Sequence, residues 1–153
     1  SVDPRNIHAY VMGEHGDSEF VPWSQAMLAT KPILSICEES GGRFCAEDME
    51  KITEEVRGAA QKIITAKKAT YYGIGMALTR ITRAVFGNES SVLTVSAMLR
   101  GEYGQKDVFV GVPCIVNRSG IQRVLELNLS EEEQARFSAS CETLRESYAG
   151  LKL

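Results

Sequence analysis

Helical and strand-like patterns occupy separate blocks of this chain, and their order constrains the fold more than any other feature. From about Ala46 to about Lys67, apolar residues recur every three or four positions among charged ones, and a second helical pattern runs from about Tyr71 to Val85. We expect the two helices to meet at a kink near Ala69-Thr70. Strand patterns follow as a group, so the chain lacks the alternation of a doubly wound nucleotide-binding fold. The order predicts an α+β domain.

Three strand-like segments follow the helices. Residues 91–98 are β-branched and apolar, and Val108, Val110 and Val112 alternate with other residues before Pro113. Residues 117–120 form a turn signal, and residues 121–129 resume the strand pattern. These segments predict a meander of three antiparallel strands, packed by the long helices.

The last segment has the signature of a helix with a well-defined start. Ser130 and Glu133 have the spacing of a capping box, in which each side chain satisfies a free backbone donor near the other residue. An apolar stripe follows at steps of three and four residues, formed by Phe137, Cys141, Leu144, Tyr148 and Leu151. We expect a C-terminal helix that buries this stripe.

The N-terminal third has weaker signals. Residues 7–12 form an apolar run that predicts a strand ending at Gly13. Residues 20–23 and 26–29 look extended or irregular, because Pro22 disfavours a central strand. Residues 38–42 are polar and contain glycine, which predicts a loop.

Size and composition indicate one cytoplasmic domain over residues 1–153. The net charge of −3 gives no electrostatic reason to expect nucleic acid or an anionic membrane as a partner, and no apolar run has the length of a membrane helix. The start of the chain does not resemble a signal peptide. The four cysteines are widely spaced, which favours reduced, mostly buried thiols, and with two histidines we expect no metal site.

The hexapeptide from Gly13 to Ser18 places a histidine, His15, between two glycines at the end of the first expected strand. Glycine allows positive φ and close approach of a ligand, and histidine is the side chain that exchanges protons most readily near neutral pH. His15 is therefore a candidate general acid/base. The alternative is a turn whose histidine only caps a neighbouring backbone group.

Several segments together resemble the substrate domain of bacterial L-lactate dehydrogenases, within the lactate/malate dehydrogenase family. The matching segments, in order, are Ile7–Tyr10, Gly13–Ser18, Val21–Ser24, Lys68–Ile74, Leu93–Ser96, Val110–Pro113 and Asn117–Gly120. The resemblance implies the fold of that family's C-terminal domain. It also implies NAD-dependent, reversible reduction of pyruvate to L-lactate, as in glycolysis ending in lactate fermentation, by a homotetramer or homodimer.

Four residues acquire roles from this resemblance. His15 matches the family's acid/base histidine, and Thr70 matches the threonine beside the pyruvate methyl group. Ile74 matches an aliphatic residue that packs on the nicotinamide ring. His8 matches the histidine with which many bacterial members bind the allosteric effector fructose 1,6-bisphosphate. Each of the last three roles has an alternative. Thr70 could be a threonine at a helix kink that bonds the previous turn, Ile74 an ordinary helix core residue, and His8 a strand histidine without a ligand.

The resemblance also implies what this segment does not carry. The family's dinucleotide-binding domain precedes the matched region and holds the glycine-rich turn, the aspartate paired with the histidine and the arginine that clamps the substrate carboxylate. Gly73-Ile74-Gly75 is not such a turn, because it follows a helical pattern and lacks a third glycine. We therefore expect a C-terminal half without a Rossmann domain, inactive alone because positioning supplies much of the rate. A lactate-like malate dehydrogenase and a non-catalytic assembly or ligand-sensing module are the competing hypotheses.

Overall fold

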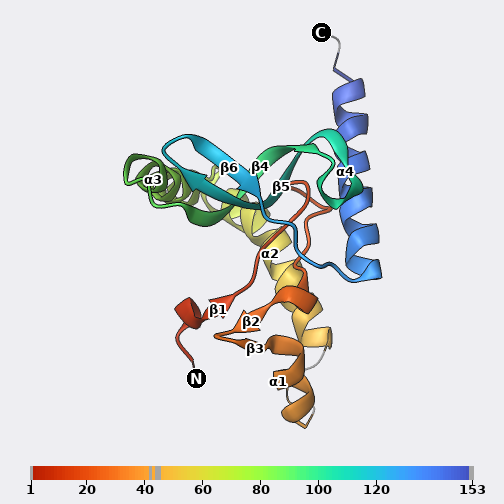
Figure 1. The fold of residues 1–153 in the computed structure, drawn as a ribbon. Helices are drawn as coiled ribbons and strands as arrows, with labels where there is room; N and C mark the ends of the chain where they lie inside the picture. Colours follow the sequence, from red (N-terminus) through yellow and green to blue (C-terminus); the bar gives the residue numbers. More distant parts are fainter. Residues whose placement is uncertain (1, 42, 44–45, 152–153) are drawn as a thin grey trace.

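The computed structural model describes residues 2–41, 43 and 46–151. The molecule has two antiparallel sheets: an upper sheet of β4, β5 and β6, packed by long helices, and a smaller lower sheet of β1, β2 and β3 (Figure 1). In chain order the elements are η1 Pro4–Asn6, β1 Ile7–His8, η2 Trp23–Gln25, β2 Met27–Leu28, β3 Lys31–Pro32, α1 Ile33–Glu39, α2 Ala46–Lys67, α3 Tyr72–Phe86, β4 Ser91–Arg100, η3 Glu102–Gly104, β5 Lys106–Asn117, β6 Gly120–Val124 and α4 Glu131–Ala149.

The upper sheet confirms the predicted antiparallel meander. Its strand order is β4-β5-β6, and the register pairs Ser91 with Val116 at one end and Leu99 with Val108 near the other. A second sheet of three very short strands, in the order β1-β2-β3, lies below it (Figure 1). The α+β class is therefore correct, although the lower sheet was not anticipated.

One face of the upper sheet forms the main core. Alternate residues of β5 from Val108 to Val116 are buried there, as a half-covered antiparallel sheet requires. Phe137 and Cys141 of α4 pack against this face, together with Met12 and Phe20 from the N-terminal segment. The N-terminal segment therefore reaches from the lower sheet into the upper core.

Pro113 lies inside β5, so the strand is longer than the predicted segment that ended before it. The carbonyl of Pro113 accepts the N–H of Leu125 at 2.8 Å, but proline has no N–H with which to return the bond. The hydroxyl of Tyr103 instead donates to the carbonyl of Leu125 at 2.7 Å and accepts the N–H of Leu127 at 2.9 Å. The Tyr103 hydroxyl thus supplies the hydrogen bond to Leu125 that the missing N–H of Pro113 cannot, so the sheet tolerates a proline here.

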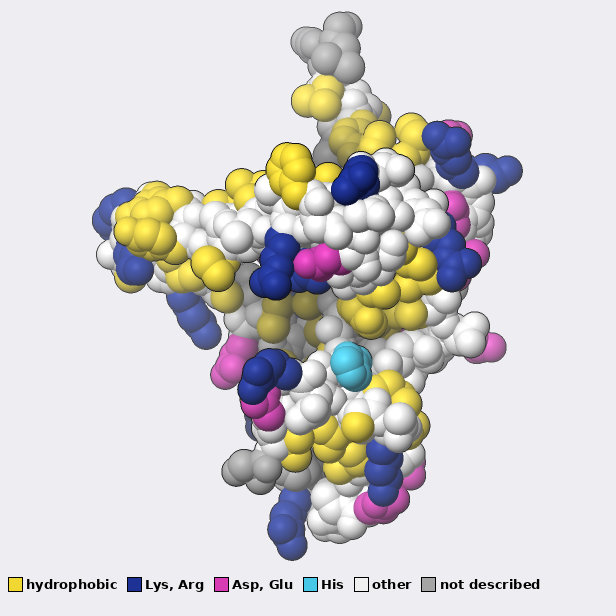
Figure 2. All heavy atoms as spheres, turned by 60° about the vertical axis from the view of Figure 1, so that its left-hand side comes forward, with side chains coloured by type: hydrophobic (Ala, Val, Ile, Leu, Met, Phe, Trp, Pro, Cys, Tyr) yellow, Lys and Arg dark blue, Asp and Glu magenta, His cyan; other side chains and the backbone are white. Residues whose placement is uncertain are grey.

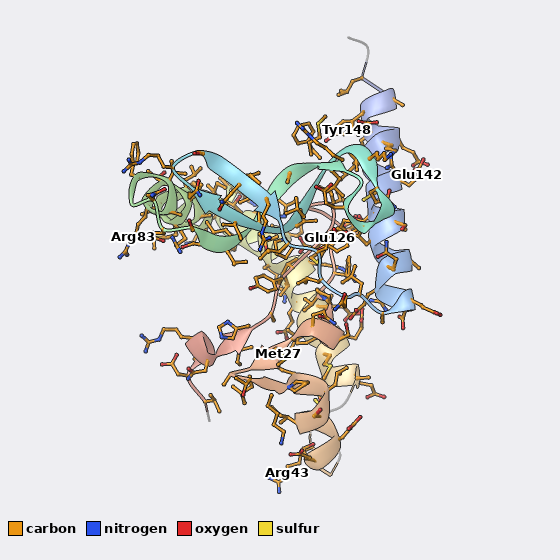
Figure 3. The ribbon with its side chains drawn as sticks, viewed as in Figure 1. Met27, Arg43, Arg83, Glu126, Glu142 and Tyr148 are labelled. Carbon is orange, nitrogen blue, oxygen red and sulfur yellow. The ribbon has the colours of Figure 1, made fainter. Side chains whose placement is uncertain are left out.

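The segment after β6 does not continue as a strand, contrary to the prediction for residues 121–129. Its backbone turns away after Val124 and is held by Tyr103 of η3 and by Gln25 of η2, whose side-chain amide donates to the carbonyl of Asn128 at 2.6 Å. Glu126, labelled in Figure 3, accepts the N–H of Tyr103 at 2.8 Å. The chain leaves the sheet here because these bonds replace the strand ladder.

Two N-terminal predictions were also wrong in extent. The strand expected over residues 7–12 is regular only at Ile7–His8, and the rest leaves the lower sheet to make single bridges at Met12 and Gly13. The loop expected over residues 38–42 begins later, because α1 continues to Glu39; residue 42 lies outside the described residues.

The long helices begin and end close to the predicted residues. The break between α2 and α3 occurs at residues 68–71, where Lys68 has a left-handed φ of 66°. The predicted apolar stripe of α2 is largely exposed: Met49 is buried, whereas Ile52 is 48% exposed. In α4 the capping box is present, but burial of the stripe stops short of Tyr148 and Leu151, which are exposed.

The surface of the described residues carries several hydrophobic patches. Figure 2 shows them on the upper part of the molecule and within a hollow between the upper and lower parts, beside which a histidine side chain lies. The most exposed large apolar side chains of α3 are Tyr72, Met76 and Phe86. No described helix combines the length and apolar character that crossing a bilayer requires.

Candidate active site

The His15 loop begins at a close contact between two glycines. Gly13 and Gly111 of β5 exchange two backbone hydrogen bonds, each 3.0 Å between nitrogen and oxygen. Gly13 has a φ of 101°, which L side chains rarely adopt, and a Cβ at Gly111 would lie 2.8 Å from the carbonyl oxygen of Gly13. Glycine at both positions therefore lets the loop start directly on the sheet.

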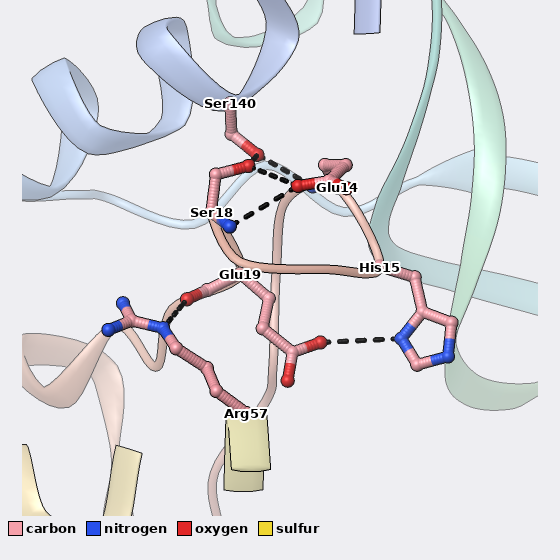
Figure 4. A network of polar contacts seen from close by, with 6 residues as sticks. All are labelled: Glu14, His15, Ser18, Glu19, Arg57 and Ser140. Atoms are coloured by element: carbon pink, nitrogen blue, oxygen red, sulfur yellow. Dashed lines mark hydrogen bonds and ion pairs between the residues drawn. The ribbon is translucent and has the colours of Figure 1, made fainter. Parts of the chain in front are cut away.

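A buried serine of α4 fixes the next residue of the loop. The Oγ of Ser140, which is fully buried, accepts the N–H of Glu14 at 2.6 Å and lies 3.0 Å from the Oγ of Ser18 (Figure 4). A Cβ at Gly13 would lie 2.6 Å from the same hydroxyl oxygen. The first and last residues of the turn are thus tied to the C-terminal helix.

The carboxylate of Glu14 closes the turn from inside. Its Oε2 accepts the Ser18 hydroxyl at 2.6 Å and the Ser18 N–H at 3.2 Å. A Cβ at Gly16 would lie 2.1 Å from the Oε1 of Glu14, so the carboxylate fills the space beside this glycine. Because Glu14 is occupied in this way, its role in the loop is structural.

His15 projects from this rigid turn with its side chain fully exposed. Its Nδ1 lies 3.3 Å from Oε2 of Glu19, whose side chain is 10% exposed (Figure 4). The carbonyl of Glu19 accepts the Nε–H of Arg57 from α2 at 2.7 Å. The geometry thus presents an accessible imidazole on a braced loop, which suits proton exchange with a bound ligand.

The segment after the loop is fixed by a second acidic residue. Glu133, at the start of α4, accepts the N–H of Ser24 at 2.9 Å as well as the Ser24 hydroxyl and the N–H of Ser130. Burial opposes ionisation of Glu133, but the hydrogen bonds from Ser24 and Ser130 outweigh it and hold the pKa of this carboxyl below its usual value. The capping residue therefore also joins the N-terminal segment to α4.

Thr70 lies between α2 and α3, on the exposed break in the helix pair. A small hollow there is lined by Ile63, Lys67, Ala69, Thr70, Tyr71, Tyr72 and Gly73. The Nζ of Lys67 lies 5.7 Å from the centre of the Tyr72 ring, within reach of a cation–π contact. Thr70 is exposed at the edge of this hollow.

Ile74 lies in the first turns of α3 and is 58% exposed, so it is not the helix core residue of the alternative hypothesis. An exposed aliphatic side chain fits the face of a nicotinamide ring. The phosphates of a dinucleotide need a glycine-rich turn between a strand and a helix, but Gly73 and Gly75 lie within α3. The described residues therefore fit a ring contact but offer no cradle for the rest of a dinucleotide.

His8 lies in β1 of the lower sheet, opposite Met27, and its side chain is exposed. No hydrogen bond or ion pair within the described part of the chain joins any two of His8, His15, Thr70 and Ile74. The described residues also hold no group of three or more His, Cys, Asp or Glu side chains suited to a metal ion. The four predicted site residues thus lie on separate strands, helices and loops, all facing solvent.

Three residues of the loop framework were not foreseen from the sequence. Ser140 could have been noticed as a polar residue beside Cys141 on the buried stripe of the last helix. Glu19 could have been noticed as an acidic residue four positions after His15. Arg57 gives no such signal, because it looks like any charged residue on the polar face of α2.

The match to known proteins covers nearly the whole chain. Residues 1–151 match the family described as lactate/malate dehydrogenase, alpha/beta C-terminal domain. L-lactate dehydrogenase 2 of Bacillus anthracis is 51% identical over 148 residues, which are 97% of this chain and 47% of that protein. L-lactate dehydrogenase of Geobacillus stearothermophilus is 50% identical over 145 residues, which are 95% of this chain and 45% of that protein.

Solved structures agree with these sequence matches. A minor L-lactate dehydrogenase from Enterococcus mundtii in the ligands-bound form superposes with a TM-score of 0.94 at 44% identity, over 99% of this chain and 48% of that chain. The chain therefore spans about half the length of the relatives it matches.

Proposed function

Because this chain belongs to the lactate/malate dehydrogenase family and matches its C-terminal domain, we propose that it is the substrate-binding half of an NAD-dependent L-lactate dehydrogenase. The preceding half of such an enzyme would carry the dinucleotide-binding domain. The observation that carries the proposal is His15, an exposed imidazole on a loop fixed to β5, α4 and α2. Each of these anchors holds the backbone and leaves the imidazole available.

His15 would exchange the proton of the reaction. In the direction of reduction, its imidazolium form hydrogen-bonds the ketone oxygen of pyruvate through Nε2 and gives up that proton as the alkoxide forms. In the reverse direction the neutral ring accepts the hydroxyl proton of L-lactate. The nicotinamide cofactor, when bound by the complete enzyme, supplies or accepts the hydride.

Thr70 and Ile74 would complete this half of the site. The exposed Thr70 methyl and hydroxyl groups suit a wall beside a small side chain such as the pyruvate methyl group. Ile74 offers an apolar contact for the ring face of the cofactor. Neither residue charges the pocket, so neither is suited to binding a second substrate carboxylate, as in a malate dehydrogenase.

His8 is proposed as a contact for fructose 1,6-bisphosphate in an oligomeric enzyme. Its exposure on the lower sheet leaves the imidazole free to meet a phosphate group. The exposed apolar side chains of α3 support assembly into a homodimer or homotetramer. With this activity, the complete enzyme would act in the cytoplasm and reduce the pyruvate formed by glycolysis to lactate.

The activity can be tested by joining this chain to the N-terminal half of the Geobacillus stearothermophilus L-lactate dehydrogenase. We expect the fusion to oxidise NADH with pyruvate and to prefer pyruvate over oxaloacetate. We expect the 153-residue chain alone to be inactive, because the described residues provide no cradle for the dinucleotide. Preference for oxaloacetate would indicate a malate dehydrogenase, and an inactive but folded fusion would favour the non-catalytic module.

A further inference from the structure

We propose that Arg57 is a positioning residue of this site: its guanidinium joins the His15 loop to α2 and so fixes the imidazole relative to Thr70, which follows that helix. The inference rests on the proposed function, since it concerns the same imidazole and the same threonine. It starts from one contact, the 2.7 Å hydrogen bond that Nε of Arg57 donates to the carbonyl oxygen of Glu19 (Figure 4).

The peptide unit between Glu19 and Phe20 closes the His15 loop, and both of its polar groups are engaged. Its N–H, from Phe20, donates to the carbonyl of Met12 at 3.0 Å, and its carbonyl, from Glu19, accepts Arg57. The first bond pairs the two ends of the loop with each other, whereas the second ties the closing end to a helix. A charged donor makes a stronger bond to a carbonyl than a neutral one, so Arg57 holds this peptide plane firmly.

Helix α2 contacts the segment after the loop through two side chains one turn apart. Oγ1 of Thr53 accepts the Nε1–H of Trp23 at 3.2 Å, and Arg57 reaches Glu19 from the next turn. Thr53 is buried, and its own hydroxyl donates to the carbonyl of Met49 at 3.0 Å. Replacing Arg57 would therefore free the end of the loop while the segment stays attached to α2 through Trp23.

Charged groups of two helices orient the guanidinium. Nη1 of Arg57 lies 3.7 Å from Oε1 of Glu50, and Oε2 of Glu50 lies 3.6 Å from Nη1 of Arg136 in α4. Such partly exposed ion pairs stabilise a fold only slightly, but they engage the Nη side of Arg57 and leave its Nε–H for the carbonyl of Glu19. In Figure 4, Arg57 and Ser140 hold the loop from opposite sides.

The Arg57 bond links two parts of the proposed site that do not touch. Helix α2 ends at Lys67 and leads directly to Thr70, whereas His15 is carried by the loop. Because no hydrogen bond or ion pair between described residues joins His15 to Thr70, their separation depends on how the loop is held to α2. A displacement of about 1 Å between reacting groups can cost about 10²-fold in rate, so this separation matters for proton transfer to a bound ketone.

Two substitutions in the fusion described above separate the hydrogen bond from the charge. Both Arg57→Gln and Arg57→Leu remove the charge, but glutamine places a donor nitrogen where arginine has Nε and leucine does not. We expect Arg57→Leu to lower kcat for pyruvate by about ten-fold with KM within about three-fold, because the other substrate contacts remain. Arg57→Gln should keep kcat within about three-fold of the parent.

Arg145→Leu is the matched control. Arg145 also reaches a backbone carbonyl from a helix, since its Nη2 donates to the carbonyl of Lys106 at 3.1 Å, and it also pairs with a helix glutamate, Glu142. It holds the start of β5 instead of the His15 loop, so kcat should stay within about two-fold. A folded Arg57→Leu fusion that keeps kcat within about two-fold of the parent would overturn the proposal. A fall of about ten-fold or more in folded Arg57→Gln would do the same, even if Arg57→Leu does not fold.

Hydrogen exchange of the loop amides gives a readout that does not depend on activity. In Arg57→Leu the Phe20 amide should exchange about ten-fold faster, because it belongs to the freed peptide unit, whereas the Glu14 amide, held by Ser140, should not change. If the fusion is inactive but the Phe20 amide responds, the contact of Arg57 with the loop stands and the proposed reaction fails. If the fusion is active but neither kcat nor exchange changes in Arg57→Leu, the reaction stands and the role of Arg57 fails.

Discussion

The substitution Ser140→Ala tests whether the α4 helix holds the His15 loop. Ser140 is completely buried and is the acceptor for the N–H of Glu14 at 2.6 Å. Alanine fits the same space but leaves this N–H without its partner, and Ser18 loses a contact at 3.0 Å while keeping the one to Glu14. The main effect is therefore one unsatisfied, partly buried donor.

The loss of one hydrogen-bond acceptor sets the size of the effect. An unsatisfied donor costs about 1–3 kcal/mol, so we expect the free energy of unfolding to fall by about 2 kcal/mol. With a urea dependence of about 2 kcal/mol per M, the unfolding midpoint moves down by about 1 M. Fluorescence of Trp23, the single tryptophan, reports the transition.

Ser147→Ala is the matched control, because it makes the same change in the same helix at an exposed site. Its hydroxyl donates to the carbonyl of Thr143 at 2.9 Å, a bond that water replaces. The gain in helix propensity is common to both variants and cancels in their difference. Midpoints of the two variants that agree within about 0.25 M would refute the anchoring role of Ser140. Hydrogen exchange at the Glu14 amide gives a second readout and should become faster only in Ser140→Ala.

Three further predictions concern the framework around the loop. Gly111→Ala should destabilise the chain by about 2 kcal/mol, because the added Cβ would press on the Gly13 carbonyl. Gly75→Ala is the control: the space around Gly75 in α3 is open, so alanine should stabilise the chain by about 1 kcal/mol, and thermal unfolding compares the two variants. The lowered pKa of Glu133 means that its stabilisation is present above about pH 4.5 and is lost as the pH falls through the folded pKa, so urea midpoints of Glu133→Gln should depend less on pH there. Burial raises the pKa of Tyr103 to about 12 from 10.0, so the stability that the neutral phenol contributes is lost as the pH rises from about 10 through about 12. In Tyr103→Phe the free energy of unfolding should decline less over this pH range, and it should be lower by about 1–3 kcal/mol at about pH 7 because two hydrogen bonds are lost.

Local patterns predicted the elements whose ends are set by their own residues. The 22-residue helix α2 begins and ends where the pattern placed it, and the Ser130–Glu133 capping box starts α4. The strand predicted over residues 7–12 failed beyond His8 because Met12 pairs with Phe20 across the His15 loop and Gly13 pairs with Gly111, far along the chain. Such partners are set by the tertiary fold and leave no periodic signal nearby.

In the candidate site, His15 could be predicted from the sequence, but most of the residues that hold its loop could not. His15 was found because a titratable side chain between two glycines, at the end of an expected strand, predicts a loop that a ligand can approach closely. The framework behind it depends on Ser140, which is 126 residues from Glu14 in the chain, and no short motif contains both. Glu19 was within reach of sequence reasoning, but its burial is a property of the fold.

The central claim is that His15 exchanges the proton in pyruvate reduction, and replacing it in the active fusion tests this most directly. In His15→Gln the ring is lost while the Glu14, Ser18 and Ser140 contacts that hold the loop remain. We expect kcat/KM for pyruvate to fall by about 10²–10⁴-fold, the contribution of a positioned general acid, with an unchanged unfolding midpoint. A His15→Gln fusion that keeps kcat/KM within about ten-fold of the parent would contradict the account.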